Sequence, residues 1–406
     1  MKGAERLKVL KNVNLIMLGV ILASVYLSQI QNLILLILVL LFYLIKNDFK
    51  IVFNMPGEWI YLLMFLWGIC TGIIGLVNRH YTSYVVFKHA YYYILVFLYW
   101  HIGGLIIRTK KNYRIIFFRT LLVASVIISL IDIITCISKV AQISGLDINS
   151  FRNLMGVGNI LSVLGVYVCL IYKEEIELSK NKRNIIIGIC VVSSVIHFSR
   201  MMILYAAIFV LISGIKLINA RWLKYIVIGV LCVGIISSVF PDLTQLFINK
   251  LLSSFTEINF KSKIWNDINI VQNWRGYEVS CAIEQFKKNS LLSQIWGSGF
   301  GTTLDVKGYA YLVTDDERLS FLHNGYFTQL LIWGILGVVC FFLWIFMMLK
   351  KTKNIKFQQD KRFARSLIFI VLVANYFVMG PFFSAMIASL FFYIGILFEL
   401  NRNALI

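Results

Sequence analysis

The sequence predicts an all-α polytopic membrane protein, and three observations support this fold class. Of the 406 residues, 59% are hydrophobic and 14% are charged, whereas soluble proteins average roughly 45–50% apolar and about 25% charged residues. Apolar runs close to the length of a membrane-spanning helix recur along the chain. These runs are continuous and do not alternate with polar residues, which indicates helices as the spanning elements.

We predict about twelve membrane-spanning helices. The predicted spans are 12–28, 32–46, 58–77, 84–107, 115–138, 157–172, 184–198, 201–218, 222–240, 323–349, 364–380 and 382–399. The basic N-terminus precedes an apolar run that a second run follows at once, as in a helical hairpin, so no cleavable signal peptide is expected. The predicted organisation is spans one to nine in residues 1–240, a long polar loop in 241–322, and spans ten to twelve in 323–406.

The distribution of Lys and Arg predicts the orientation of the chain. Basic residues gather at the N-terminus and in the turns that follow even-numbered spans, for example 108–111, 180–183 and 350–353. Cytoplasmic loops carry such an excess, so we expect both termini in the cytoplasm and the long loop in the periplasm. This distribution also accounts for the net charge of +20. Because no basic patch is interleaved with exposed aromatic residues, a nucleic-acid partner is not expected.

The long loop has the pattern of an extramembrane unit with amphipathic helices. Residues 243–255 predict a helix on the membrane surface. Residues 274–287 predict a second helix with Val279, Ala282, Ile283 and Phe286 on one face. A glycine-rich turn follows at 296–301. It lacks the strand-before, helix-after context of a nucleotide fingerprint, which argues against a phosphate loop.

Four polar residues are predicted on the outer side near helix ends: Arg152, Arg200, Arg275 and His323. The planar guanidinium fork suits phosphate oxygens, so three converging arginines would suit a pyrophosphate. Alternatively, each arginine extends to lipid headgroups. The imidazole of His323 can accept a proton from a hydroxyl, although a histidine that only caps a helix is the alternative.

Other polar residues lie within or beside the spans. Lys88 and His89 lie near the outer end of the fourth span and Asp132 lies in the fifth; they line a substrate path or pair with one another. Asn324 and Tyr326 would orient His323 or line its site. The seven cysteines form no CxxC pair, and we interpret the acidic run at 315–317 as an exposed turn. No metal and no cofactor are therefore expected.

Several motifs together match a known family. They are Ser199-Arg200 at the start of a span, Arg275-Gly276-Tyr277-Glu278, the turn Gly297-Ser298-Gly299-Phe300-Gly301, His323-Asn324-Gly325-Tyr326, and Trp333-Gly334-Ile335-Leu336-Gly337. In this order the motifs resemble the O-antigen polymerase and O-antigen ligase superfamily of bacterial membrane glycosyltransferases. Arg152 with Gly156 and Asn159 is similar to an earlier motif of the family, without its usual Asn-Pro-Asn.

The resemblance implies an all-helical, GT-C-like transferase in the bacterial inner membrane. Its donor would be a glycan on undecaprenyl pyrophosphate. By similarity, His323 would activate an acceptor sugar hydroxyl, and Arg152, Arg200 and Arg275 would bind the pyrophosphate. Inversion at the anomeric carbon without a metal would follow. Glu278, Asn324, Tyr326, Lys88 and His89 are the residues expected to support this site.

Two reactions of this superfamily stay open. In the first, a polymerase joins lipid-linked repeat units of a surface polysaccharide, with a chain-length regulator as a further partner besides membrane lipids. In the second, a ligase transfers finished O-antigen to lipid A-core, and the ten residues between His323 and Gly334 are a spacing associated with ligases. A transporter or flippase is a more distant alternative, which would predict internal repeats that the chain does not show.

Overall fold

The protein is all-helical in the part that the structure describes, which confirms the all-α part of the predicted fold class. The computed structural model describes residues 14–46, 49, 55–78, 80–108, 113–143, 158–197, 199–213, 234, 238 and 265–402. Within these ranges the only strand-like pairing is an isolated antiparallel bridge between Leu304 and Leu319. Arg152, the predicted surface helix at 243–255 and all of the predicted ninth span except residues 234 and 238 lie outside the described residues.

Among the described residues, five helices are long and apolar enough to cross a membrane. They are α3 (Gln29–Lys46), α4 (Glu58–Val77), α5 (Ser83–Arg108), α6 (Tyr113–Ile143) and α17 (Gly325–Lys351). Shorter apolar helices are α2 (Leu15–Tyr26), α8 (Ile160–Ile171), α11 (Arg200–Ser213) and α20 (Leu390–Arg402). The remaining helices at predicted spans are α10 (Lys180–Ile196) and α18 (Gln358–Phe377). These elements support a membrane protein, and the count of about twelve spans stays a prediction.

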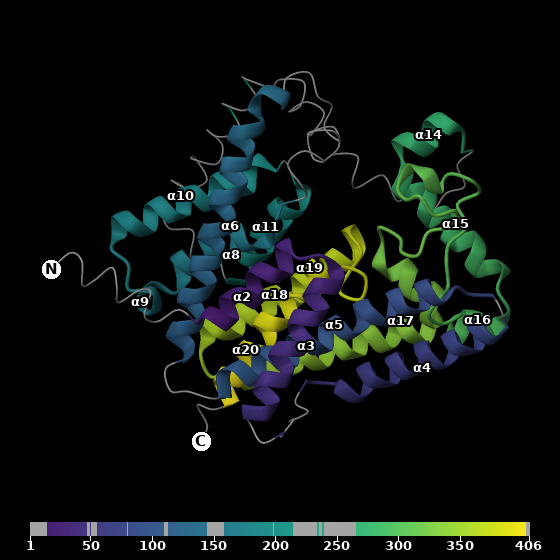
Figure 1. The fold of residues 1–406 in the computed structure, drawn as a ribbon, viewed down its shortest axis with the longest axis horizontal. Coiled ribbons are helices and arrows are strands. Elements are labelled where there is room, and N and C mark those ends of the chain that lie inside the picture. Colours follow the sequence, from purple (N-terminus) through teal and green to yellow (C-terminus); the bar gives the residue numbers. More distant parts are fainter. Residues whose placement is uncertain are drawn as a thin grey trace. The chain divides into compact units, whose positions relative to one another are not determined.

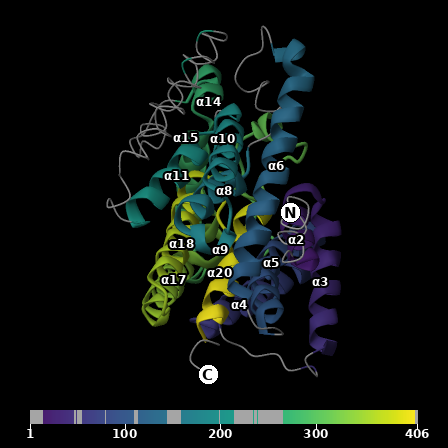
Figure 2. The same cartoon turned by 90° about the vertical axis from the view of Figure 1, so that its left-hand side faces the viewer.

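The chain divides into two compact units. The first comprises Met1–Leu35, Ile106–Ser253 and Gln358–Ser366, and the second comprises Leu36–Leu105, Ser254–Phe357 and Leu367–Ile406. In the first unit, α8 and α10 lie beside the long helix α6, as Figure 2 shows, and α2 packs on α6 as well. The short helix α9 (Lys173–Ile176) also packs against α6 and α8.

The second unit has an aromatic core between its membrane helices. Tyr61 of α4 and Tyr93 of α5 lie with their ring centroids 4.4 Å apart, and the ring of Tyr93 stacks on Phe382 at 4.5 Å. Trp344 of α17 stacks on Phe382 as well, at 5.7 Å. All four rings are almost fully buried, so burial of apolar surface and ring contacts hold α4, α5 and α17 together. The small helices η3 (Thr352–Asn354) and α19 (Ala385–Ala388) complete this part.

A polar segment of the second unit joins these helices. It contains α14 (Asp267–Gln272), α15 (Trp274–Lys288), α16 (Leu291–Trp296) and the 3-10 turn η2 (Ala310–Leu312). Figure 1 shows α16 against the ends of α4 and α17, with α15 leading away toward α14. The helix predicted at 274–287 is thereby confirmed as α15. Its buried face carries Val279, Cys281 and Ala282, the last two of which join a core with Leu304 and Leu319.

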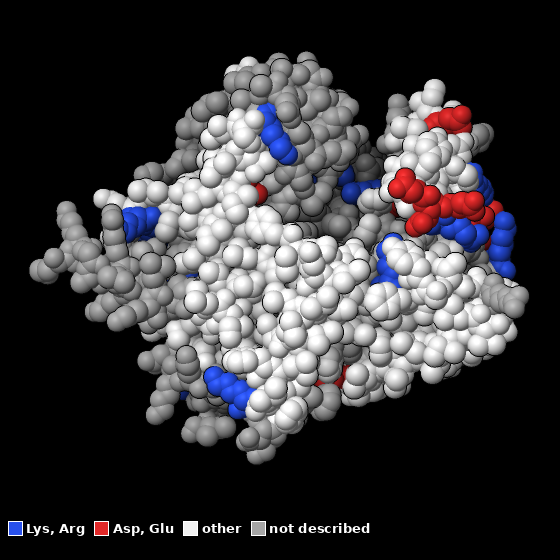
Figure 3. Space-filling model, in the orientation of Figure 1, with Lys and Arg blue, Asp and Glu red and all other residues white. Residues whose placement is uncertain are grey.

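Charged side chains gather over this polar segment, as Figure 3 shows, whereas the surface of the same face over α4 carries almost none. Glu284 forms ion pairs with Lys288 at 2.8 Å and with Lys307 at 2.6 Å. These two ammonium groups lower the pKa of Glu284 to about 2. Burial raises the pKa of the neighbouring Cys281 thiol. The segment therefore has the mixed-charge surface and apolar interior of a water-exposed unit.

Candidate functional site

His323 forms a close pair with Glu278, and this pair is the centre of the candidate site. His323 Nδ1 lies 2.9 Å from Glu278 Oε1 and 3.1 Å from Oε2. The His323 backbone N–H also donates to Oε2 at 3.1 Å. The side chain of Glu278 is 1% exposed and that of His323 is 29% exposed. The carboxylate is therefore buried behind an imidazole that remains accessible.

The hydrogen bonds of Glu278 determine which nitrogen of His323 is basic. The carboxylate accepts from the Trp274 indole N–H at 2.7 Å, from the backbone N–H of His323 at 3.1 Å, and lies 2.9 Å from the ring nitrogen Nδ1 of His323. Because a carboxylate only accepts, Nδ1 must carry the hydrogen, and Nε2 of the neutral ring keeps its lone pair. Glu278 can also stabilise the positive charge that appears when Nε2 takes a proton. This arrangement suits a general base.

Both partners of the pair are placed by ordinary helix chemistry. Glu278 lies one turn after Trp274 on α15, and this spacing of four residues lets the indole reach the carboxylate. His323 directly precedes Asn324, the N-cap of α17, whose side chain accepts from the N–H groups of Tyr326 and Phe327. The Leu322 N–H donates to Thr328 Oγ1 at 3.0 Å. The backbone at His323 is therefore held on both sides.

A break in α17 and the glycine-rich turn support this end of the helix together. Gly334 interrupts α17 with φ 66° and ψ −165°. The turn supplies backbone N–H groups to the carbonyls near the break, from Ser298 to Leu331 at 3.0 Å and from Gly299 to Ile332 at 2.8 Å. Carbonyls that lack an intrahelical donor inside a membrane need such partners. The turn predicted not to bind phosphate thus has a structural role.

The contact between Gly297 and Gly334 tolerates no side chain. A Cβ on Gly334 would lie 2.3 Å from the Ile295 carbonyl oxygen, and one on Gly297 would lie 2.2 Å from the Ile332 carbonyl oxygen. Both residues also have positive φ, which glycine adopts without strain. The residues between His323 and Gly334 thus separate the candidate site from the break in α17 along the chain.

His89 anchors the loop that leads to His323. Its Nε2 lies 3.0 Å from the Ser320 carbonyl oxygen, and its Nδ1 accepts from the Gly301 N–H at 3.2 Å. The side chain is 1% exposed, so it cannot contact a substrate. His89 is therefore a positioning residue that ties α5 to both ends of the segment 301–320.

A cavity of about 320 Å³ lies in front of the pair. It is lined by Lys88, Glu278, Val313, Thr314, Asp316, Leu319, Ser320, Phe321, His323 and Met379. The hydroxyl groups of Thr314 and Ser320 and the carboxylate of Asp316 are groups that hydrogen-bond sugar hydroxyls. The cavity therefore combines a base, hydroxyl-binding groups and one ammonium group.

The other predicted site residues of the second unit lie around this cavity. Arg275 is in the first turn of α15, three residues before Glu278, but it does not line the cavity. Asn324 caps α17, and the Tyr326 hydroxyl donates to the Leu372 carbonyl oxygen at 3.0 Å. Asn324 thus holds the backbone directly after His323, whereas the Tyr326 side chain contacts the backbone of α18. Trp274 was missed by the sequence reasoning, although its spacing from Glu278 is a helical one.

Arg200 lies at the start of α11 in the first unit. Just before it, His197 Nε2 lies 3.1 Å from Asp132 Oδ2, and the Ser193 hydroxyl donates to the same oxygen at 2.7 Å. His197 is 3% exposed. Asp132 therefore pairs with His197, whereas Lys88 and His89 make contacts of their own in the second unit. This cluster joins the interior of α6 to the C-terminal end of α10, close in sequence to Arg200.

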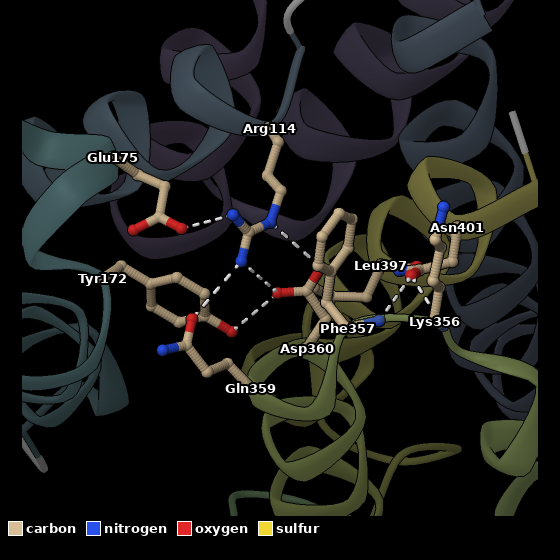
Figure 4. A network of polar contacts seen from close by, with 9 residues as sticks. All are labelled: Arg114, Tyr172, Glu175, Lys356, Phe357, Gln359, Asp360, Leu397 and Asn401. Carbon is tan, nitrogen blue, oxygen red and sulfur yellow. Dashed lines mark hydrogen bonds and ion pairs between the residues drawn. The ribbon is translucent and has the colours of Figure 1, made fainter. Parts of the chain in front are cut away.

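A second polar network in the first unit was not predicted (Figure 4). Arg114 of α6 donates to both carboxylate oxygens of Asp360, at 3.2 and 3.1 Å, and pairs with Glu175. The Tyr172 hydroxyl donates to Asp360 Oδ1 at 3.1 Å. The Asp360 side chain is fully buried. The network joins the starts of α6 and α18 to the segment around α9.

No metal site accompanies either cluster in the part of the chain that the structure describes. No group of three or more His, Cys, Asp or Glu residues there could hold a metal ion. Residues 315–317 are exposed, in agreement with their interpretation as an acidic turn.

Residues 185–342 match the family model described as O-antigen ligase. The match includes Arg200, Arg275, Glu278, His323 and Gly334, so the predicted resemblance is confirmed over this part of the chain. Lys88 and His89 precede the matched segment. No curated protein matches the chain.

Proposed function

Because residues 185–342 carry the domain of the O-antigen ligase family, we propose that the protein transfers a lipid-linked glycan to a sugar hydroxyl, as a polymerase of surface-polysaccharide repeat units. The single observation that carries the proposal is the His323–Glu278 pair at the cavity. A buried carboxylate behind an accessible imidazole is the arrangement that general-base catalysis requires.

The proposed reaction is a single displacement. His323 Nε2 takes the proton of the acceptor hydroxyl as its oxygen attacks the anomeric carbon of the donor. The bond between that carbon and the pyrophosphate oxygen breaks, its electron pair stays with undecaprenyl pyrophosphate, and the configuration inverts. Glu278 stabilises the imidazolium. Arg152, Arg200 and Arg275 are proposed to bind the leaving pyrophosphate, and no step needs a metal or a cofactor.

The proposed setting is the inner membrane of a bacterial cell. About twelve spans would place both termini in the cytoplasm and the segment 241–322 in the periplasm, where lipid-linked glycans would reach the cavity. The mixed-charge surface of the α14–α15 segment supports this placement. Membrane lipids and a chain-length regulator are the further partners proposed.

The ligase reaction is the second candidate. The distance from His323 to the break at Gly334 corresponds to the spacing associated with ligases, and the matched family model has a ligase description. A lipid A-core acceptor would present a hydroxyl to Nε2 in the same way.

The polysaccharide made by a deletion strain distinguishes the two reactions. We expect a lipid A-core that carries a single repeat unit, because ligation continues without polymerisation. Unmodified core together with accumulated lipid-linked polymer would instead identify the ligase. Normal long-chain polysaccharide in the deletion strain would contradict both. Gel electrophoresis of lipopolysaccharide and analysis of lipid-linked glycans provide the measurement.

A further inference from the structure

We infer that Lys88 binds the diphosphate group of the lipid-linked donor beside His323. This assignment rests on the proposed function and adds a cation to the three arginines named above. Lys88 belongs to α5 and lies outside the segment that matches the family model. Four observations support the assignment.

Lys88 lines the same cavity as the base. The cavity of about 320 Å³ is bounded by Lys88 and Phe321 as well as by His323 and Glu278. No other Lys or Arg lines this cavity among the described residues of the second unit. Arg275 lies one turn before Glu278 but outside the lining. The ammonium of Lys88 is therefore the positive charge that a substrate in this cavity meets.

The charge of Lys88 is not neutralised by the protein in the described part of the chain, where it forms no ion pair or hydrogen bond. Its Nζ lies 5.3 Å from the Phe321 ring centroid and 5.5 Å from that of Tyr84. Aromatic faces attract an ammonium group without removing its charge. All three N–H donors thus remain for an anionic oxygen.

The energetic cost of this position favours a functional role. Lys88 is on a helix long and apolar enough to span a membrane, where a cation is costly and usually faces a cavity or a ligand. A diphosphate in the cavity would offset that cost through charge-assisted hydrogen bonds.

The position of Lys88 relative to the base is fixed. The next residue, His89, contacts the Ser320 carbonyl and the Gly301 N–H. Ser320 is three residues before His323, so the wall that carries Lys88 is tied to the loop that carries the base. The charged residues of the cavity lining suit two different parts of the donor. Lys88 offers a site for phosphate, while Asp316 repels phosphate and suits sugar hydroxyls.

The test measures binding of undecaprenyl pyrophosphate without a sugar to purified full-length protein in nanodiscs of phosphatidylcholine. This probe contains the diphosphate and no sugar carboxylate. Lys88→Met removes the charge, Lys88→Arg keeps it, and Lys287→Met is the matched control, since Lys287 is exposed on α15 and does not line the cavity. Size-exclusion chromatography and thermal unfolding verify that each variant is folded.

We expect Lys88→Met to weaken binding at least about tenfold, the loss of one charge-assisted contact. We expect Lys88→Arg and Lys287→Met to bind as the wild type does. Wild-type affinity in a folded Lys88→Met variant overturns the assignment. The assignment is also overturned if Lys88→Met loses binding to vesicles that contain phosphatidylglycerol as strongly as it loses binding to the probe, because Lys88 would then contact lipid headgroups. Since His323→Ala should bind the probe yet fail to elongate glycans, failure of the Lys88 assignment is distinguishable from failure of the proposed function.

Discussion

At His323, the proposed role as a base depends on which ring nitrogen carries the proton. Glu278 fixes this by accepting from Nδ1 while a second donor, the Trp274 indole, occupies its Oε1. The carboxylate is buried and the imidazole is accessible, so the proposed substrate would approach the imidazole at Nε2. Orientation and electrostatic support for the base thus come from one side chain of α15.

Substitutions of His323 and of Glu278 should reduce glycan transfer to different extents. His323→Ala removes the base and should reduce glycan transfer by roughly 10²- to 10⁴-fold. Glu278→Gln keeps the shape but not the charge and should cost about tenfold to a hundredfold. Polysaccharide length on gels and transfer by purified protein measure both effects. Glu284→Gln, an exposed change on the same helix, is the control, and long-chain polysaccharide from His323→Ala would remove this residue from catalysis.

Lys88, Glu278 and His323, which were named from the sequence, line one cavity, but the contacts of these residues were not predictable. Glu278 was expected only as a supporting residue of a motif, because its pairing with His323 spans 45 positions along the chain. His89 was expected to line a path, and the structure shows that it binds two loop backbones. Periodicity indicates which face of a helix is buried, whereas such long-range pairs depend on the packing of several elements.

At the level of elements, α17 has a side-chain cap at its N-terminus and an interruption of the helix at Gly334. The cap holds the backbone beside His323, and the break at Gly334 receives the glycine-rich turn. The turn also donates from the Phe300 N–H to the Gly68 carbonyl at 3.0 Å. Helices α4 and α17 are therefore linked through a turn that the sequence identified only as glycine-rich.

Gly334→Ala should disrupt this link. The new methyl would meet the Ile295 carbonyl oxygen at 2.3 Å, at a residue with φ 66°, so we expect a loss of about 1–3 kcal/mol from backbone strain alone. The turn 297–301 would shift, and we expect this shift to reduce elongation of the glycan. Gly104→Ala is the matched control, since a Cβ there meets nothing within 4 Å. Thermal unfolding in detergent measures the difference, and equal melting temperatures for the two variants would contradict this role for Gly334.

The network around Arg114 makes a further prediction about elements. Arg114→Met would leave the buried carboxylates of Asp360 and Glu175 without their cation. Breaking a buried pair in this way costs about 3–5 kcal/mol, so we expect a large fall in the unfolding temperature. Lys353→Met, at an exposed lysine, should leave it unchanged. A wild-type melting curve for Arg114→Met would show that the ion pairs contribute no net stability.

For the whole molecule, composition was sufficient to predict an all-helical membrane protein, because apolar run length and charge density reflect the bilayer directly. Predicted spans such as 58–77 coincide with the observed helix Glu58–Val77. The network of Figure 4 was not foreseen, since Lys and Arg were interpreted there mainly as signals of orientation. Charge counts do not show which carboxylate a loop arginine will bind.

The proposed orientation of the chain can be tested with two single substitutions. Lys287→Cys, on the exposed side of α15, is predicted in the periplasm, and Lys353→Cys, in the turn after α17, is predicted in the cytoplasm. A membrane-impermeant maleimide should label the first variant in intact spheroplasts and the second only after permeabilisation, because the reagent cannot cross the bilayer. The unsubstituted protein controls for its own cysteines, of which Cys281 is buried. Labelling of Lys353→Cys in intact spheroplasts would reverse the proposed topology and place the His323 cavity on the cytoplasmic side, where a periplasmic acceptor could not reach Nε2.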